Sequence, residues 1–164
     1  MCNKIFFAVI SFFIFNLSFS QFVKEDIVAK WEVKRMVYKK DTLDFPVVDK
    51  SASKAFFAMI ANDRKPGLSG SDSSTNVMSV GMVYGMMTFL KYEFKGNGEF
   101  WGLMERKGVL DGRKMGTYKL NGDKLKLNSD DSNSKDAEYT LVKKDNIIYL
   151  MINVDGVEIY YQKF

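Results

Sequence analysis

The 164-residue sequence contains no histidine and a single cysteine, Cys2. Without histidine the chain has no imidazole base for a Ser-His-Asp triad and no histidine ligand for zinc. Cys2 lies in a segment that we expect to be removed, so the mature chain would carry neither a disulfide nor a reactive thiol. An enzyme would have to use carboxylates, tyrosine or lysine. We therefore expect no enzymatic activity, no cofactor and no bound metal.

The acidic residues do not gather into a candidate catalytic or calcium site. In the predicted strands they alternate with apolar residues, which is typical of side chains that face solvent. The polar loop 128–136 contains several carboxylates but lacks the glycine and the final glutamate of an EF-hand, which argues against calcium.

The sequence also lacks a strong excess of charge of one sign. Its formal net charge is +4, with acidic and basic residues interspersed. Removing residues 1–20 takes away Lys4 and no acid, which lowers the charge to +3. Because no basic stripe stands out, we expect no nucleic-acid partner. We expect the mature chain to be a monomer.

Residues 1–20 have the pattern of a secretory signal peptide. A short polar start with Lys4 precedes an apolar run at 5–15, and small residues precede Gln21. The run is shorter than the ~20 apolar residues of a membrane span, although an uncleaved anchor is the alternative. We expect cleavage near Ser20, a secreted or periplasmic protein, and one folded domain at 21–164.

Short alternating segments separated by turn sequences fill residues 91–164. The turn sequences are Gly-Asn-Gly at 96–98, Asn-Gly at 121–122, and Asp-Gly at 111–112 and 155–156. Asn-Gly and Asp-Gly accept positive φ at both central positions of a type I′ turn, so they predict hairpins. The pattern predicts a mainly β protein, an antiparallel up-and-down barrel of about eight strands.

Residues 28–38 predict the first strand of this barrel. Trp31, Val33, Arg35 and Val37 share one phase of the alternation, with Trp31 facing the core. Arg35 is the unexpected member of the apolar phase. Either it lies near the barrel mouth with its charge in water, or it lies inside and meets a ligand carboxylate.

The region 49–90 departs from a plain series of hairpins. After a connector at 39–49, apolar residues at three- and four-residue spacing predict a helix at 51–63, capped by Ser51 or Asp49. We therefore expect an insertion of two helices between the first and second strands.

The second helix is predicted at 77–90, after a polar loop at 68–76. This segment is apolar nearly all round, so a long strand is the alternative. Met78, Met82 and Met86 recur every four residues, which favours the helix. Met-rich surfaces adapt to varied apolar shapes, although filling core gaps is the simpler role for these side chains.

Four segments together resemble a known family. They are IVAKWEV at 27–33, YEFKGNGEF at 92–100, GTYKLNGDKL at 116–125 and the closing hairpin through Gly156. The chain resembles the lipocalin-like domain proteins secreted by Bacteroidetes. True lipocalins carry glycine two residues before the first-strand tryptophan, whereas this chain has Ala29 there. The resemblance implies a barrel that holds a small ligand.

The leading hypothesis for function is a binding protein for a small apolar or amphipathic ligand, such as a fatty acid, held inside the barrel. An eight-stranded barrel is also small enough to be filled by its own side chains. The alternative is therefore a filled barrel that acts as a structural or protein-interaction module at the cell envelope. The candidate ligand-binding residues are Trp31, Arg35, Met82, Met86, Tyr92, Phe94, Phe100, Tyr118 and Tyr139.

Overall fold

The structure, a computed structural model, describes residues 22–47, 49–65, 70–132 and 136–164. The predicted signal segment 1–20 lies outside the described residues. The elements are, in chain order, the 3₁₀ helix η1 (Lys24–Asp26), β1 (Ala29–Tyr38), β2 (Asp41–Asp44), α2 (Lys50–Arg64), α3 (Gly70–Phe89), β3 (Lys91–Phe94), β4 (Glu99–Arg106), β5 (Val109–Asn121), β6 (Lys124–Ser129), β7 (Ala137–Lys144), β8 (Ile147–Val154) and β9 (Val157–Lys163).

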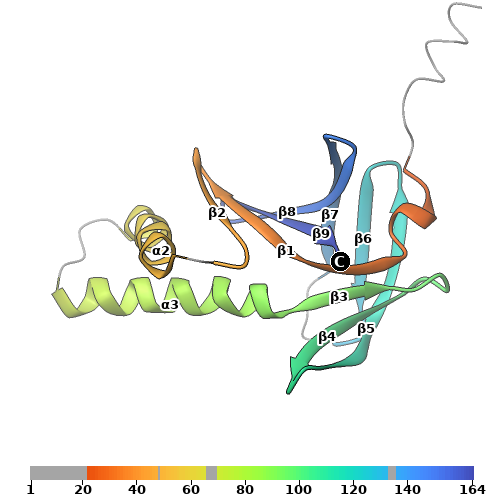
Figure 1. Ribbon diagram of the computed structural model, residues 1–164, viewed down its shortest axis with the longest axis horizontal. Helices are drawn as coiled ribbons and strands as arrows, with labels where there is room; N and C mark the ends of the chain where they lie inside the picture. Colours follow the sequence, from red (N-terminus) through yellow and green to blue (C-terminus); the bar gives the residue numbers. More distant parts are fainter. Residues whose placement is uncertain (1–21, 48, 66–69, 133–135) are drawn as a thin grey trace, which may run out of the picture.

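The strands form an antiparallel sheet that closes on itself (Figure 1). Its order is β2-β1-β3-β4-β5-β6-β7-β8-β9, and a further pairing joins β1 to β9. β1 and β3 to β9 are therefore an eight-stranded up-and-down barrel, as the alternation predicted. β2 pairs with β1 alone and lies outside this ring, so the prediction of a plain connector at 39–49 is wrong for these four residues.

β1 has two different neighbours along one edge. Its first residues, from Ala29 to Trp31, pair with β3, and its last residues, from Arg35 to Tyr38, pair with β2. β1 and β3 thus separate after Trp31. α3 runs directly into β3, so the helices are tied to the barrel beside this separation.

β1 contains one extra residue relative to β9. Val33 is opposite Tyr161 but Arg35 is opposite Tyr160, so Lys34 is a bulge. A bulge reverses the inside-outside phase of the residues that follow it. Consequently Met36 is fully buried and Arg35 is exposed, and the prediction that Arg35 shares the interior phase with Trp31 is wrong.

Of the predicted tight turns, Asp155-Gly156 is confirmed, whereas those at 121–122 and 111–112 are corrected. Asp155 and Gly156 both have positive φ, at 51° and 84°, as a type I′ turn requires. Asn121 still belongs to β5, where it pairs with Lys124, so the chain reverses at Gly122 and Asp123, and Gly122 has a φ of 61°. The predicted turn at 111–112 is wrong. The chain reverses instead at Lys107 and Gly108, which have φ of 52° and 77°, and Asp111 pairs with Met104 inside β5.

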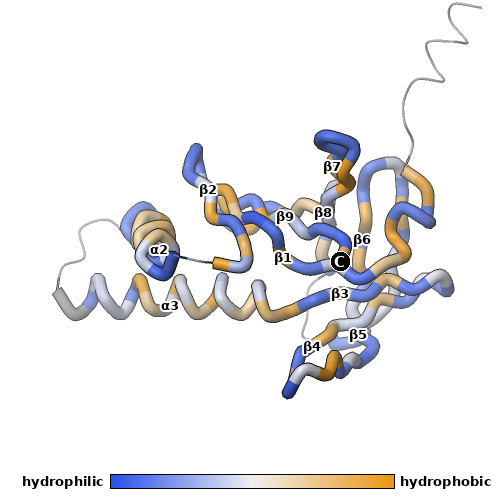
Figure 2. The backbone as a smooth tube through the Cα atoms, in the orientation of Figure 1, coloured by the Kyte–Doolittle hydropathy of each residue, from blue (hydrophilic) through white to orange (hydrophobic). Residues whose placement is uncertain are grey.

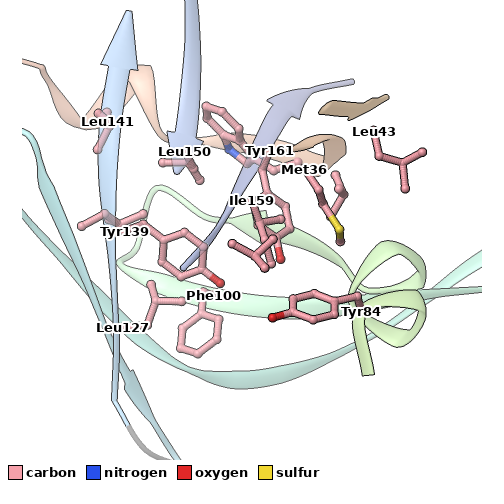
Figure 3. Packing of buried hydrophobic residues seen from close by; sticks show 14 of the residues in the cluster. Met36, Leu43, Tyr84, Phe100, Leu127, Tyr139, Leu141, Leu150, Ile159 and Tyr161 are labelled. Carbon is pink, nitrogen blue, oxygen red and sulfur yellow. The ribbon is translucent and has the colours of Figure 1, made fainter. Parts of the chain in front are cut away.

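Trp31 is buried at the end of the barrel next to η1, to which it is linked through Ile27, the residue that follows that helix. Its side chain is fully buried, and its indole nitrogen donates a hydrogen bond to the Ile27 carbonyl oxygen at 2.9 Å. The buried cluster continues through the barrel toward the helices. Figure 3 shows Phe100, Tyr139 and Tyr161 meeting in the interior, while Tyr84 enters the cluster from α3.

Both predicted helices are present. The Asp49 carboxylate accepts a hydrogen bond from the Ser51 backbone N–H at 2.8 Å, as a cap of α2. α3 begins at Gly70, so the loop predicted at 68–76 is wrong from that residue on. The Asn76 amide holds the early part of α3 on α2 by donating to the Ala61 carbonyl at 2.9 Å.

The helix pair stands to one side of the barrel (Figure 1), and α3 carries few hydrophilic residues along its later turns (Figure 2). Within the described part of the chain, no helix is long and apolar enough to cross a membrane.

Candidate ligand-binding site

The six aromatic residues predicted to face the interior do so. Trp31, Phe94, Phe100, Tyr118 and Tyr139 are buried, and Tyr92 is partly buried against the same cluster.

These rings occupy the barrel interior by packing against one another. The centroid of Phe94 lies 5.2 Å from that of Tyr118 and 6.3 Å from that of Phe100. Tyr92 lies 6.2 Å from Tyr139 and 5.5 Å from Tyr161. At such distances aromatic rings are in direct contact. The predicted ligand-binding aromatics therefore form a packed core.

Three tyrosine hydroxyls meet inside this core. Hydrogen bonds link Tyr92 with Tyr139 and with Tyr161, and burial raises the pKa of all three hydroxyls above the usual 10.0. Buried hydroxyls need partners, and these three supply one another. Among the described residues, no buried side-chain nitrogen or oxygen is left without a hydrogen bond. The cluster is thus satisfied without a ligand.

A hollow of about 590 Å³ lies where the helix pair meets the barrel wall. Small-molecule sites typically have volumes of ~300–1,000 Å³. α2, α3, β1 and the segment after β2 all contribute to it. We call it the helix–barrel groove; its apolar walls are Val33, Phe45, Val47, Phe57 and Phe89.

Two glycines give the groove its space on the α3 side. Gly81 and Gly85 are one helical turn apart and both line the groove. A Cβ atom added at Gly85 would meet nothing within 4 Å, and one at Gly81 would lie 3.7 Å from the Phe57 ring. Both positions therefore have room for a side chain, and glycine leaves that room open.

Few polar groups line the groove. Thr88 donates to the Gly85 carbonyl at 2.7 Å, so its hydroxyl is already bonded within α3. Glu32 is the charged residue of the lining, and its carboxylate lies 3.2 Å from the Lys91 ammonium. The same ammonium lies 3.6 Å from the Glu105 carboxylate. The groove is therefore apolar with a negative balance of charge at one edge.

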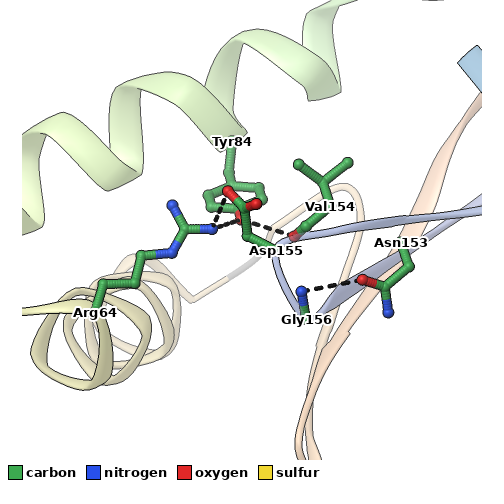
Figure 4. Close-up of polar contacts among 6 residues, drawn as sticks. All are labelled: Arg64, Tyr84, Asn153, Val154, Asp155 and Gly156. Atoms are coloured by element: carbon green, nitrogen blue, oxygen red, sulfur yellow. Dashed lines mark hydrogen bonds and ion pairs between the residues drawn. The ribbon is translucent and has the colours of Figure 1, made fainter.

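The helix pair is held on the barrel by a polar clamp (Figure 4). The Arg64 guanidinium donates to the Tyr84 hydroxyl at 2.6 Å and to the Asp155 carboxylate at 2.9 Å. The Tyr84 hydroxyl in turn donates to the Val154 carbonyl at 3.2 Å. Burial raises the pKa of Tyr84 despite the nearby guanidinium, so the hydroxyl keeps its proton for this bond. The clamp therefore ties both helices to Val154 and Asp155 at the turn between β8 and β9.

Three residues predicted to bind ligand lie outside the barrel interior. The Arg35 guanidinium forms an ion pair with Asp44 at 2.6 Å, and its side chain is 53% exposed. Met82 and Met86 are exposed on α3. None of the three lines the helix–barrel groove.

Arg113 of β5 is in register with the inner phase of the barrel, although its side chain is exposed. It lies opposite Gly102, which lies opposite Tyr92 of the core. Arg113 lines a hollow of about 410 Å³ together with Leu90 and Met115. The alternation of β5 could not place it, because a bulge at Met115 changes the phase.

A closed, eight-stranded, up-and-down antiparallel barrel is the architecture of the lipocalins. The strand pairing therefore makes this chain a lipocalin-like barrel with a two-helix insertion.

Comparison with models of protein families and with curated proteins found no match. Two solved structures are similar to the chain, each with a TM-score of 0.44. One is a lipocalin-like protein from Bacteroides uniformis, 14% identical, with 85% of this chain and 99% of that chain covered. The other is an uncharacterized protein from Bacteroides eggerthii, 13% identical, with coverage of 84% and 99%. An overlap this low supports no conclusion, so the barrel rests on its own strand pairing.

Proposed function

We propose that this protein binds a small apolar ligand in the helix–barrel groove. The observation that carries the proposal is the apolar hollow of about 590 Å³ beside Gly81 and Gly85. Apolar surface that a ligand covers is removed from water, which contributes roughly 25 cal/mol per Å² before the costs of association.

The groove is a better site than the barrel interior because the interior is already packed. A ligand among the aromatic rings would have to displace side chains such as Phe94 and Tyr139, which are 1% and 4% exposed. Displacing core side chains costs several kcal/mol. A ligand in the groove would displace no core side chain.

The charges at the groove favour a neutral ligand over a fatty acid. The Lys91 ammonium already has two carboxylate partners, Glu32 and Glu105. An added ligand carboxylate would bring a third negative charge to one ammonium. We therefore propose an amphiphile with an uncharged polar end, such as a long-chain alcohol or a monoacylglycerol.

The test uses two substitutions at one position. Gly85→Leu fills the groove, whereas Gly85→Ala adds only the Cβ atom. Both should stabilise α3, since glycine in a helix interior is ~1 kcal/mol less favourable than alanine. Binding is followed with the uncharged fluorophore N-phenyl-1-naphthylamine, displaced by dodecanol or by dodecanoate.

We expect dodecanol to displace the fluorophore at lower concentration than dodecanoate. Gly85→Leu should weaken binding by about tenfold or more, equivalent to ~1.4 kcal/mol, while Gly85→Ala binds nearly as the parent does. Equal binding by the parent and Gly85→Leu would place the ligand elsewhere, for example beside Arg113. A parent protein that binds none of these compounds would refute the proposal.

Export remains part of the proposal. The signal-like residues 1–20 support a secreted or periplasmic binding protein of the Bacteroidetes lipocalin-like type, without catalytic activity. A protein-interaction module is the second candidate function, and the exposed methionines of α3 favour it.

A further inference from the structure

α3 exposes a row of large apolar side chains that the described residues of the chain leave uncovered. Met78, Met82, Met86 and Phe89 are 69%, 58%, 64% and 74% exposed. We call these four residues the α3 stripe. Val83 flanks it and is 52% exposed. Single exposed apolar residues are ordinary, but a contiguous row of them marks an interaction surface.

The geometry of a helix places the stripe opposite the core. At 100° per residue, the four stripe residues fall within about 80° of one another. The buried residues Val80 and Tyr84 fall on the opposite side of the helix. Gly85 lies between the two faces, next to the stripe, and lines the groove.

The stripe and the helix–barrel groove are therefore one continuous apolar surface. Phe89 belongs to both, since it lines the groove and is mostly exposed. Anything that covers the stripe would also cover the open side of the groove.

We infer that two copies of this chain pair through their α3 stripes, and that each copy covers the open side of the other's groove. Residues 73–90 contain no charged side chain, so two identical stripes face each other without repulsion between like charges. In a twofold-symmetric pair, the symmetry axis passes between the two α3 helices at the midpoint of each stripe. This midpoint lies between Met82 and Met86, so the central methionines of one copy contact those of the other. This dimer replaces the monomer expected from the sequence.

The polar groups near the stripe do not select a different partner. The Ser79 hydroxyl donates to the Thr75 carbonyl at 2.9 Å, within the helix itself. A partner with polar recognition groups would gain little from such a surface. Thioether and aromatic side chains, by contrast, adapt readily to a second copy of themselves.

The area of the stripe predicts a weak, reversible dimer. With on the order of 100 Å² of exposed surface on each of five side chains per copy, pairing would bury roughly 1,000 Å² in total, close to the lower bound for a specific interface. Interfaces of this size form weak or transient complexes. The dimer should therefore dissociate in the micromolar range.

Sedimentation velocity of the purified protein between about 1 and 100 μM tests the inference, since this range spans the expected dissociation constant. The parent should change from monomer to dimer. The double variant Met82→Ser, Met86→Ser should weaken the dimer by about tenfold or more. Met104→Ser is the matched control, because Met104 is a 50% exposed methionine outside α3. Thermal unfolding of each variant checks that the fold is kept.

A parent that stays monomeric at the highest concentration overturns the inference. So does a dimer that the double variant leaves intact. Monomeric protein that sediments with phosphatidylcholine vesicles also overturns it, because the stripe would then contact lipid. The pairing does not depend on the proposed ligand. Gly85→Leu should block ligand binding in the groove and leave the dimer in place. The ligand-binding proposal and the dimer can therefore fail independently, and this variant distinguishes the two failures.

Discussion

Replacing Tyr84 with phenylalanine tests how the helix pair is held on the barrel. The substitution removes one oxygen atom and keeps the ring, which is fully buried. That oxygen accepts a hydrogen bond from Arg64 and donates one to the Val154 carbonyl. Arg64 keeps its ion pair with Asp155. The variant therefore loses the central link of the clamp and little packing.

The expected magnitude follows from these two bonds. A hydrogen bond between neutral groups contributes ~1 kcal/mol, and one to a charged group ~1.5–3 kcal/mol. The Arg64 side chain is 32% exposed, so water replaces part of the lost bond. A net loss of ~1–3 kcal/mol should raise the equilibrium constant for local opening of the helix pair away from the barrel roughly 5- to 150-fold.

Amide hydrogen exchange followed by mass spectrometry measures this opening. Peptides from α2 and α3 should exchange faster in Tyr84→Phe than in the parent, while peptides from β5 to β7 keep their rates. Tyr149→Phe is the control, because among the described residues the Tyr149 hydroxyl has no hydrogen bond. Equal acceleration in helices and barrel would mean that the two unfold together, and unchanged exchange in the helices would mean that the clamp contributes nothing.

Three further predictions address the core, the alkaline range and export. Trp31→Ala should cost ~3–5 kcal/mol in urea unfolding, and a loss below ~1 kcal/mol would contradict the fully buried position of this ring. Burial raises the pKa of Tyr160 to about 12 and also raises that of Tyr161. Above pH ~10 the unfolded chain therefore releases protons that the folded chain keeps, so stability should be complete below that pH and then fall by up to ~1.4 kcal/mol per pH unit per tyrosine. Tyr161→Phe should make this fall shallower, and an unchanged slope would rule out Tyr161 as a contributor. Mass spectrometry of exported protein should find a chain that begins near Gln21, and an intact Met1 would disprove cleavage.

The barrel could be predicted from sequence because its determinants are local. Alternation identifies strands, and Asp-Gly at 155–156 identifies a turn, since each depends on neighbouring residues only. The Asp49 cap of α2 is likewise local. β2 was missed because its four residues include two aspartates, which have low strand propensity, and only pairing with β1 holds them extended.

Two bulges change the side of the sheet on which arginines lie, and the one in β1 explains why the predicted interior position of Arg35 was wrong. Lys34 is an extra residue in β1 relative to β9, and Met115 is an extra residue in β5 relative to β4. Each bulge exists only in relation to a partner strand distant in the sequence. Alternation counted without the bulge in β1 places Arg35 inside, whereas counting with it places Arg35 outside. Counting with the bulge in β5 puts Arg113 in register with Gly102 and Tyr92, with its side chain exposed.

The environment of α3 could not be read from periodicity, because the helix has no polar face along its later turns. One side carries Tyr84 into the core, a second carries Gly81 and Gly85 along the groove, and a third carries Met82 and Met86 into solvent. A segment that is apolar all round would ordinarily be covered all round. Here the residues that the structure describes cover the first side and leave the second and third open. α3 therefore has more apolar surface than the described residues cover. For this reason we expect a ligand at Gly81 and Gly85 and a second copy of the chain at Met82 and Met86.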